Sequence, residues 1–378
     1  MVVCLCGSAA VAQAPKKAGP AKSAPAAAAD QGAPKWKAIW EPVHVGVDIK
    51  LNDVYFVSPD VGWVAGDKGS IYHTKDGGKT WTAQLGGDPA GSEPPVKDLR
   101  FLNDKQGWAV LGDGKLLRTT DGESWEEYGK VGEYYGYYYD YLFLSPTEGV
   151  QIVKEGDGLF RTQDGGKSWK QVHPRCAVKV EAGGLPVTAP CRLKSLFFTS
   201  PETGYAVGAS LNPAVFVVLK TNDGGNSWVT HATVPDVAHV DESYSEQYIA
   251  FTDANNAVAV LRRWPKTLIT SDGGATWRGV ISQAKGPVKF ADAQVGWSFN
   301  IDYDANRPTF SYTSNGGKTW GSRQMQLPGV PHAFCVPRRD RGYLVGDHGM
   351  VFRYRVIPES EPTPPKAILA PLVAGAAK

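Results

Sequence analysis

The sequence lacks an excess of charge of either sign. Its 378 residues include 40 lysines and arginines and 38 aspartates and glutamates, for a formal net charge of +2. A chain so close to neutrality has no broad positive field to hold a nucleic acid or an anionic membrane surface. We therefore predict no nucleic-acid partner and expect any charged binding site to be a local patch.

Long apolar runs are also missing. A membrane-spanning helix needs about 20 consecutive apolar residues, and the run from Ala367 to Ala377 is too short and is interrupted by Pro371. We predict no transmembrane segment. Residues 1–14 form a short apolar stretch that ends in Ala12-Gln13-Ala14, which resembles a secretory cleavage site without the usual positive start. We expect a signal and export to a periplasm, a lumen or the medium, with an ordinary N-terminus as the alternative.

Motifs for metal or cofactor chemistry are absent as well. The Cys4-x-Cys6 pair does not have metal-site spacing, and the histidines show no HExxH pattern. Neither a nucleophile elbow nor a phosphate-binding loop is present. The sequence predicts no metal, no cofactor and no catalytic residue.

Cysteine is scarce, with 5 in the chain. After loss of the signal, Cys176, Cys191 and Cys335 remain. Cys176 and Cys191 flank a Gly/Pro-rich stretch that we interpret as one loop, and an oxidising compartment favours a disulfide between them. Cys335 lies in an apolar strand pattern and is expected to be buried.

What the chain does have is glycine, proline and tryptophan, 43, 27 and 12 residues respectively, which is typical of many short strands and tight turns. Residues 15–34 are an Ala/Pro/Lys-rich linker and residues 358–378 a Pro/Ala-rich tail. The folded domain is predicted to span residues 35–357.

One phrase recurs six times within that domain. An Asp, or once an Asn, is followed by one or two glycines, a Ser or Thr after one intervening residue, and a Trp. The tryptophans are Trp81, Trp125, Trp169, Trp228, Trp277 and Trp320, at intervals of about 43 to 59 residues. Such a period is typical of propeller blades with four strands each.

A second phrase precedes each box: an apolar strand, then a small residue and an aromatic or apolar one, as in Gly62-Trp63. A seventh copy, Gly342-Tyr343, has no box after it. The strand missing from this seventh unit can be supplied by residues 36–40, which would close the ring. The sequence therefore predicts an all-β fold, a seven-bladed propeller of four-stranded blades with Asp-box turns.

The boxes are best explained by folding. An Asp accepts hydrogen bonds from backbone N–H groups of a tight turn, and glycines reach positive φ at low cost. Six copies of a turn are structural repeats rather than six active sites, so no box residue is taken as a site residue.

The combination of Gly-Trp-x-Val-Gly-Asp-like phrases, at 62–69 and 342–349, with Asp-Gly-Gly-Lys-Thr-Trp boxes resembles the photosystem II stability and assembly factor family of seven-bladed propellers. The likeness spans residues 50–354. It implies a non-catalytic, exported, monomeric scaffold that binds a protein partner and assists a membrane or envelope protein complex. The alternative is a sialidase-like glycoside hydrolase or a carbohydrate-binding propeller, because such proteins carry similar boxes.

The resemblance also implies an arginine-rich surface patch. Candidates are Arg262 and Arg263 before Trp264, with Arg307 in the next unit, although isolated solvated cations are an equal alternative. Six tyrosines between residues 133 and 141 offer a second contact area, in which alternate rings could instead enter the core. These partner-binding candidates are Tyr134, Tyr135, Tyr137, Tyr138 and Tyr139, continuing to Tyr141. Both groups lie on the face where the longer inter-strand loops are predicted.

If the expected disulfide forms in the exported protein, titration of the unreduced, denatured mature protein with a thiol reagent will find one free thiol per chain. Cys335 is the expected free residue. Three free thiols would contradict the pairing of Cys176 with Cys191.

Overall fold

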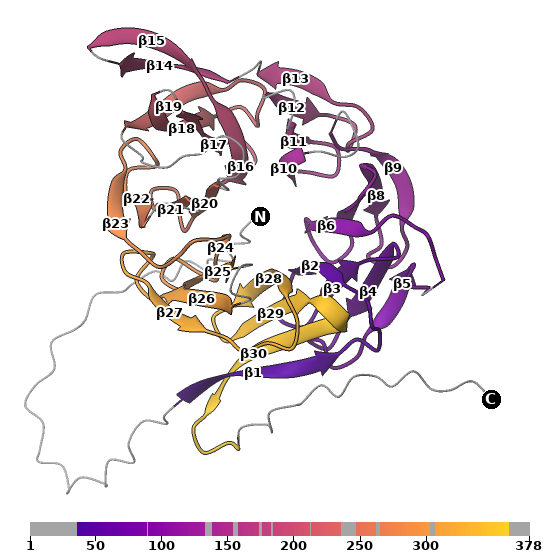
Figure 1. Ribbon diagram of the computed structural model, residues 1–378. Helices are drawn as coiled ribbons and strands as arrows, with labels where there is room; N and C mark the ends of the chain where they lie inside the picture. Colours follow the sequence, from indigo (N-terminus) through magenta and orange to yellow (C-terminus); the bar gives the residue numbers. More distant parts are fainter. Residues whose placement is uncertain are drawn as a thin grey trace, which may run out of the picture.

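A ring of seven four-stranded sheets makes up the fold (Figure 1). The computed structural model describes residues 36–362, apart from 89, 133–137, 154–157, 174–175, 183, 212, 236–246, 262–264 and 303–306. Each sheet is antiparallel and its strands follow one another from the channel to the rim. The seven-bladed propeller predicted from the sequence is confirmed.

Each blade runs outward from its innermost strand. Blade 1 is β2 (Leu51–Phe56), β3 (Gly62–Gly66), β4 (Ser70–Thr74) and β5 (Thr82–Leu85); blade 2 is β6 (Val96–Phe101), β7 (Gly107–Leu111), β8 (Lys115–Thr119) and β9 (Glu126–Lys130); blade 3 is β10 (Tyr138–Phe143), β11 (Gly149–Val153), β12 (Leu159–Thr162) and β13 (Lys170–His173). Blade 4 is β16 (Arg192–Phe198), β17 (Gly204–Leu211), β18 (Ala214–Thr221) and β19 (Val229–Pro235); blade 5 is β20 (Gln247–Phe251), β21 (Ala257–Leu261), β22 (Lys266–Thr270) and β23 (Arg278–Ile281). Blade 6 is β24 (Val288–Phe290), β25 (Gly296–Asp302), β26 (Arg307–Thr313) and β27 (Gly321–Gln324); blade 7 is β28 (Pro331–Arg338), β29 (Arg341–Gly346), β30 (Met350–Pro358) and β1 (Trp36–His44), with the short 3-10 turn η1 (Asp347–Gly349) before β30.

The two ends of the domain meet in blade 7, as predicted. Strand β1 pairs with β30 along its full length, from Trp36 opposite Pro358 to His44 opposite Met350. The carboxylate of Glu41 lies 2.6 Å from the guanidinium of Arg353, and both side chains are largely buried. The outermost strand of the last blade thus comes from the start of the domain, which closes the ring.

A phenylalanine near the end of an innermost strand explains the glycine that opens the next strand. A Cβ placed on Gly107 would lie 2.3 Å from Phe101, so only glycine leaves room for the ring. The same close contact joins Gly62 to Phe56, Gly149 to Phe143, Gly204 to Phe198 and Gly296 to Phe290. Blade 5 is different, because Ala257 occupies this position opposite Phe251.

The aromatic residue after that glycine packs across to the next blade. Trp63 of blade 1 stacks on Phe101 of blade 2 with ring centroids 3.8 Å apart. Equivalent stacks join Trp108 to Phe143, Tyr205 to Phe251 and Tyr343 to Phe56. The core therefore consists mainly of clusters between neighbouring sheets rather than one central mass.

Each Asp box is a closed set of local hydrogen bonds. In blade 5, the carboxylate of Asp272 accepts bonds from the hydroxyl of Thr270 at 2.8 Å and from both the hydroxyl and the backbone N–H of Thr276. Gly273 and Gly274 have φ of 69° and 84°, which glycine adopts without strain. The bonds from Thr276 lower the pKa of Asp272 to about 2, so the turn stays charged and intact at neutral pH.

The boxes also join the blades. The carbonyl of the first box glycine accepts a hydrogen bond from a side chain of the preceding blade. The donors are Gln84 to Gly122 (2.8 Å), Trp108 to Gly165 (3.2 Å), Arg161 to Gly224 (3.0 Å), His231 to Gly273 (3.0 Å), and both Tyr343 (3.1 Å) and Arg353 (2.8 Å) to Gly77. Because the donor type varies while the acceptor stays fixed, the turn is the constant part of the junction.

One prediction about the connections is wrong. The stretch between Cys176 and Cys191, interpreted as a loop, is a two-stranded hairpin of β14 (Ala177–Ala182) and β15 (Leu185–Pro190) that lies at the rim between blades 3 and 4 (Figure 1). A disulfide joins Cys176 to Cys191 at its base. Cross-strand pairs such as Val178 opposite Ala189, both buried, give this segment an apolar face and hence a reason to form strands.

The contact between glycine and phenylalanine leads to a stability prediction. Gly107→Ala forces a methyl group into the ring of Phe101, and such overpacking costs about 1–3 kcal/mol. Ala257→Gly, at the equivalent position of blade 5, removes a methyl group and costs about 0.5–1 kcal/mol. Urea unfolding of both variants measures the difference, and a smaller loss for Gly107→Ala than for Ala257→Gly would contradict the explanation.

Candidate functional site

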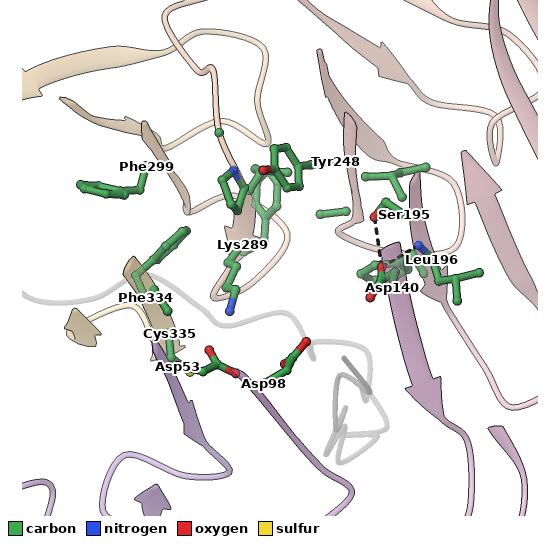
Figure 2. A pocket seen from close by; sticks show the side chains of 18 of the residues that line it. Asp53, Asp98, Asp140, Ser195, Leu196, Tyr248, Lys289, Phe299, Phe334 and Cys335 are labelled. Atoms are coloured by element: carbon green, nitrogen blue, oxygen red, sulfur yellow. Dashed lines mark hydrogen bonds between the residues drawn. The ribbon is translucent and has the colours of Figure 1, made fainter. Parts of the chain in front are cut away.

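The innermost strands of all seven blades enclose a central channel. It contains a cavity of about 470 Å³ whose lining comes from β2, β6, β10, β16, β20, β24 and β28, with Phe299 and Asn300 of β25 added. Blade closure makes this space, since segments from every part of the domain contribute to it. Its two opposite walls differ in chemistry, as Figure 2 shows.

One wall carries three aspartates around a single arginine. The guanidinium of Arg100 contacts the carboxyl group of Asp98 and lies 3.6 Å from Asp140 and 3.9 Å from Asp53. It also lies over the ring of Tyr141, 5.2 Å from its centroid. Blades 1, 2 and 3 each supply one of these carboxyl groups, so Arg100 holds three blades together by charge.

Two of the aspartates also bridge neighbouring backbones. A bulge in β2 lies beside Asp53, whose carboxylate accepts the N–H of Val54 and that of Leu99 in the next blade, both at 2.8 Å. Asp140 lies at a similar bulge and accepts the N–H groups of Tyr141 at 2.9 Å and Leu196 at 2.8 Å. Both carboxylates therefore have a structural task.

Burial changes the titration of the groups in this wall. Desolvation raises the pKa of Asp98 well above its ordinary value, against the opposing pull of Arg100. Desolvation likewise raises the pKa of Tyr55 to about 12. Arg100 balances part of the negative charge of the three carboxyl groups.

The opposite wall is mainly aromatic. The ammonium of Lys289 lies 5.4 Å from the ring centroid of Phe334, and Phe299 packs beside that ring at 6.4 Å. Cys335 is free and buried in this wall, as expected from its strand pattern, and burial raises the pKa of its thiol.

The structure describes only some of the residues predicted from the sequence for partner binding. Arg262, Arg263, Trp264, Tyr134, Tyr135 and Tyr137 lie outside the described residues. Tyr138 and Tyr139 are the first residues of β10, and Arg307 is the first residue of β26, where it pairs with Asp302. Tyr141 was expected to extend the exposed patch, and this is wrong, because it is fully buried beside Arg100.

Sequence reasoning missed the aspartate cluster, although a signal for it exists. Three successive units contain an Asp three positions before the Phe that ends the innermost strand, at Asp53, Asp98 and Asp140. A repeated polar residue in an otherwise apolar strand points to a shared task. The Asp boxes are a longer and more frequent repeat, which makes this shorter one harder to recognise in the sequence.

Among the described residues, no three His, Cys, Asp or Glu side chains gather in a way that could hold a metal ion. Within residues 36–362, the undescribed gaps aside, no helix has the length and hydrophobicity of a membrane span.

Comparison with known proteins adds to this geometry. The family described as "Photosynthesis system II assembly factor YCF48" matches residues 33–91. The photosystem II assembly protein Ycf48 of Synechococcus sp. strain JA-2-3B'a(2-13) is 29% identical over 83% of this chain and 88% of its own length. The chain is a seven-bladed propeller that is similar to photosystem II assembly factors.

The match to the chloroplast photosystem II stability/assembly factor HCF136 of Arabidopsis thaliana is 30% identical, but it covers 38% of this chain and 36% of that protein. A solved structure of YCF48 bound to a D1 peptide superposes with a TM-score of 0.56 at 19% identity, over 84% of this chain and 96% of that one. A virginiamycin B lyase from Staphylococcus aureus reaches a TM-score of 0.60 at 10% identity, over 85% and 100% respectively. Because an enzyme superposes as well as an assembly factor, these structural likenesses show the fold alone.

The charge balance around Arg100 in this assembly factor-like propeller can be tested by mutation. Arg100→Met leaves three carboxyl groups without their cation, and breaking such a partly buried network costs about 3 kcal/mol of unfolding free energy at neutral pH. Lowering the pH protonates the carboxyl groups, so the loss relative to wild type should shrink.

Arg339→Met is the control, because its pair with Asp292 is exposed and such pairs contribute less than about 1 kcal/mol. Denaturant unfolding at several pH values measures both variants. Equal losses in the two would show that Arg100 is not the centre of the cluster.

Proposed function

We propose that this propeller is a non-catalytic scaffold that binds a protein partner and assists the assembly or stability of a membrane or envelope protein complex. The observation that carries the proposal is the similarity to the photosystem II assembly protein Ycf48 along 88% of that protein's length. A match over 83% of this chain is long enough to take in most of a ring of this size. A YCF48 of known structure is bound to a D1 peptide, which favours a polypeptide partner here.

The chemistry of the channel supports a binding role over catalysis. A sialidase-like glycosidase, the alternative, needs a tyrosine nucleophile with an acidic partner and a separate carboxylic acid, all free to act on a sugar. Asp53 and Asp140 each accept two backbone N–H groups, and Asp98 contacts Arg100. The carboxyl groups of this wall are therefore committed to holding blades together.

Export is part of the proposal. The expected signal over residues 1–14, the disulfide between Cys176 and Cys191, and relatives named as chloroplastic or as a lipoprotein support a periplasmic, lumenal or extracellular location. The scaffold is proposed to act as a monomer.

For the binding face, we propose the side of the ring that carries the connections between blades. From the strand order we expect the β25–β26 hairpin and the connection before β10 on this side, opposite the boxes. The proposed contacts are the cations Arg262, Arg263 and Arg307, with Trp264 beside them, and the rings of Tyr134, Tyr135, Tyr137, Tyr138 and Tyr139. Arginine and tyrosine are enriched among the residues that anchor protein interfaces.

A charge-matched pair of variants tests this face. Arg262/Arg263/Arg307→Ala should weaken capture of the partner by tenfold or more, since truncating an interface anchor costs about 2 kcal/mol. The control Arg338/Arg339/Lys318→Ala removes three exposed cations from the opposite side and should bind normally. Capture is measured at fixed salt against membrane complexes solubilised from the source cells, with the bound proteins identified by mass spectrometry.

Loss of capture in the control alone would place the interface on the box side. Hydrolysis of a glycoside by the purified protein, with no complex captured by any form, would overturn the scaffold function itself.

A further inference from the structure

Lys289 is a cation in the channel wall that has no ion-pair partner within the described part of the chain. It is the middle residue of the three-residue strand β24 and is only partly exposed. Among the described residues its ammonium has no carboxylate at ion-pair distance, and its recorded contact is with the ring of Phe334. Figure 2 shows the ammonium directed into the space that Asp53 and Asp98 face from the other side.

The opposite wall holds three carboxyl groups and one cation, but none of these carboxyl groups lies at ion-pair distance from Lys289. The carboxylate of Asp53 accepts backbone N–H groups on both oxygens, and Arg100 stands against the carboxyl groups of Asp98 and Asp140. The aspartate cluster thus has its own cation and its own hydrogen bonds. A partly buried ammonium without a partner is costly, and a ligand carboxylate would remove that cost.

The shape of the site suits an extended chain. Each innermost strand is hydrogen-bonded to one neighbour in its sheet, so its other edge can offer the channel those backbone N–H and C=O groups that side chains of the next blade, such as Asp53 and Asp140, do not already bind. Extended peptides pair with such edges through their own backbone. The cavity of about 470 Å³ lies within the range of roughly 300–1,000 Å³ typical of binding sites, and Phe299 and Phe334 provide apolar contacts beside the cation.

We propose that the channel binds an extended segment of a polypeptide partner, with the carboxylate of an aspartate or glutamate paired to Lys289 and the adjacent apolar side chain against Phe299 and Phe334. This inference rests on the proposed function as a protein-binding scaffold. It adds the chemistry of the segment that the scaffold recognises and a second site, separate from the arginines on the loop face.

The test begins with an unbiased probe. A phage-displayed library of random peptides about ten residues long is selected on the full mature protein, with Lys289→Met as the counter-target. We expect enriched peptides to share one acidic residue next to an apolar one. Peptides without a common acidic residue, or no enrichment at all, would overturn the proposal.

Binding of an enriched peptide is then measured by fluorescence anisotropy. Because the proposed contact is a hydrogen-bonded charge pair, we expect Lys289→Met to bind the peptide about tenfold more weakly than wild type does. Wild type should lose affinity to the same extent when the acidic residue of the peptide is replaced by its amide. Lys289→Arg should restore most of the affinity, which a merely structural defect would not allow. Lys79→Met removes an exposed lysine of the box side and should change nothing.

Thermal unfolding of each variant verifies that the ring is intact before binding is compared. If the intact Lys289→Met variant binds the peptide as wild type does, the channel site is wrong. Capture of the membrane complex is measured in parallel. If the complex is captured but no peptide binds, the channel site is wrong and the scaffold function still holds. If wild type captures no complex, both the scaffold function and the channel site are contradicted.

Discussion

In five of the six boxes, the carbonyl of the first glycine is the point at which one blade is hydrogen-bonded to the next. The box Asp and its Ser or Thr neighbours fix the turn, and a side chain of the preceding blade donates to this carbonyl at five of the seven junctions. Each such bond contributes about 1 kcal/mol. The fixed acceptor is what allows the donor to be a glutamine at one junction and an arginine or tyrosine at another.

This arrangement separates stability from recognition. The bonds of the boxes and the stacks between Trp63 and Phe101 and their equivalents lie between blades, toward the side of the box turns. The connections on the other side take little part in these contacts between blades. They can therefore be longer, as in the hairpin of β14 and β15, which is closed by a disulfide. A rigid ring with variable connections and a central channel is the form expected of a binding platform.

Local chemistry made the blades predictable. Boxes, Gly-aromatic phrases and strand alternation are set by residues close in sequence, so the number of blades and the closure by residues 36–40 follow from counting units. The hairpin between Cys176 and Cys191 was mistaken for a loop because prolines at positions 186 and 190 suggested broken structure. Both prolines belong to β15, where they lie opposite Glu181 and Ala177. The N–H of Cys191 donates to the carbonyl of Cys176, which makes every second residue from Cys191 a hydrogen-bonded one and leaves the two prolines at positions between them. Their missing N–H groups therefore cost the hairpin no hydrogen bond.

The sequence by itself determined the repeat, the turn chemistry, the buried Cys335 and the likeness to assembly factors. Only the tertiary structure decided what the innermost strands do, because Asp53, Asp98, Arg100 and Asp140 come from three blades and Lys289 from a fourth. Whether a carboxyl group is paired, protonated or free depends on neighbours brought together by ring closure, and Coulomb interactions and desolvation act through space rather than along the chain. The channel, with Lys289 in its wall, therefore exists as a site only once all seven blades have met.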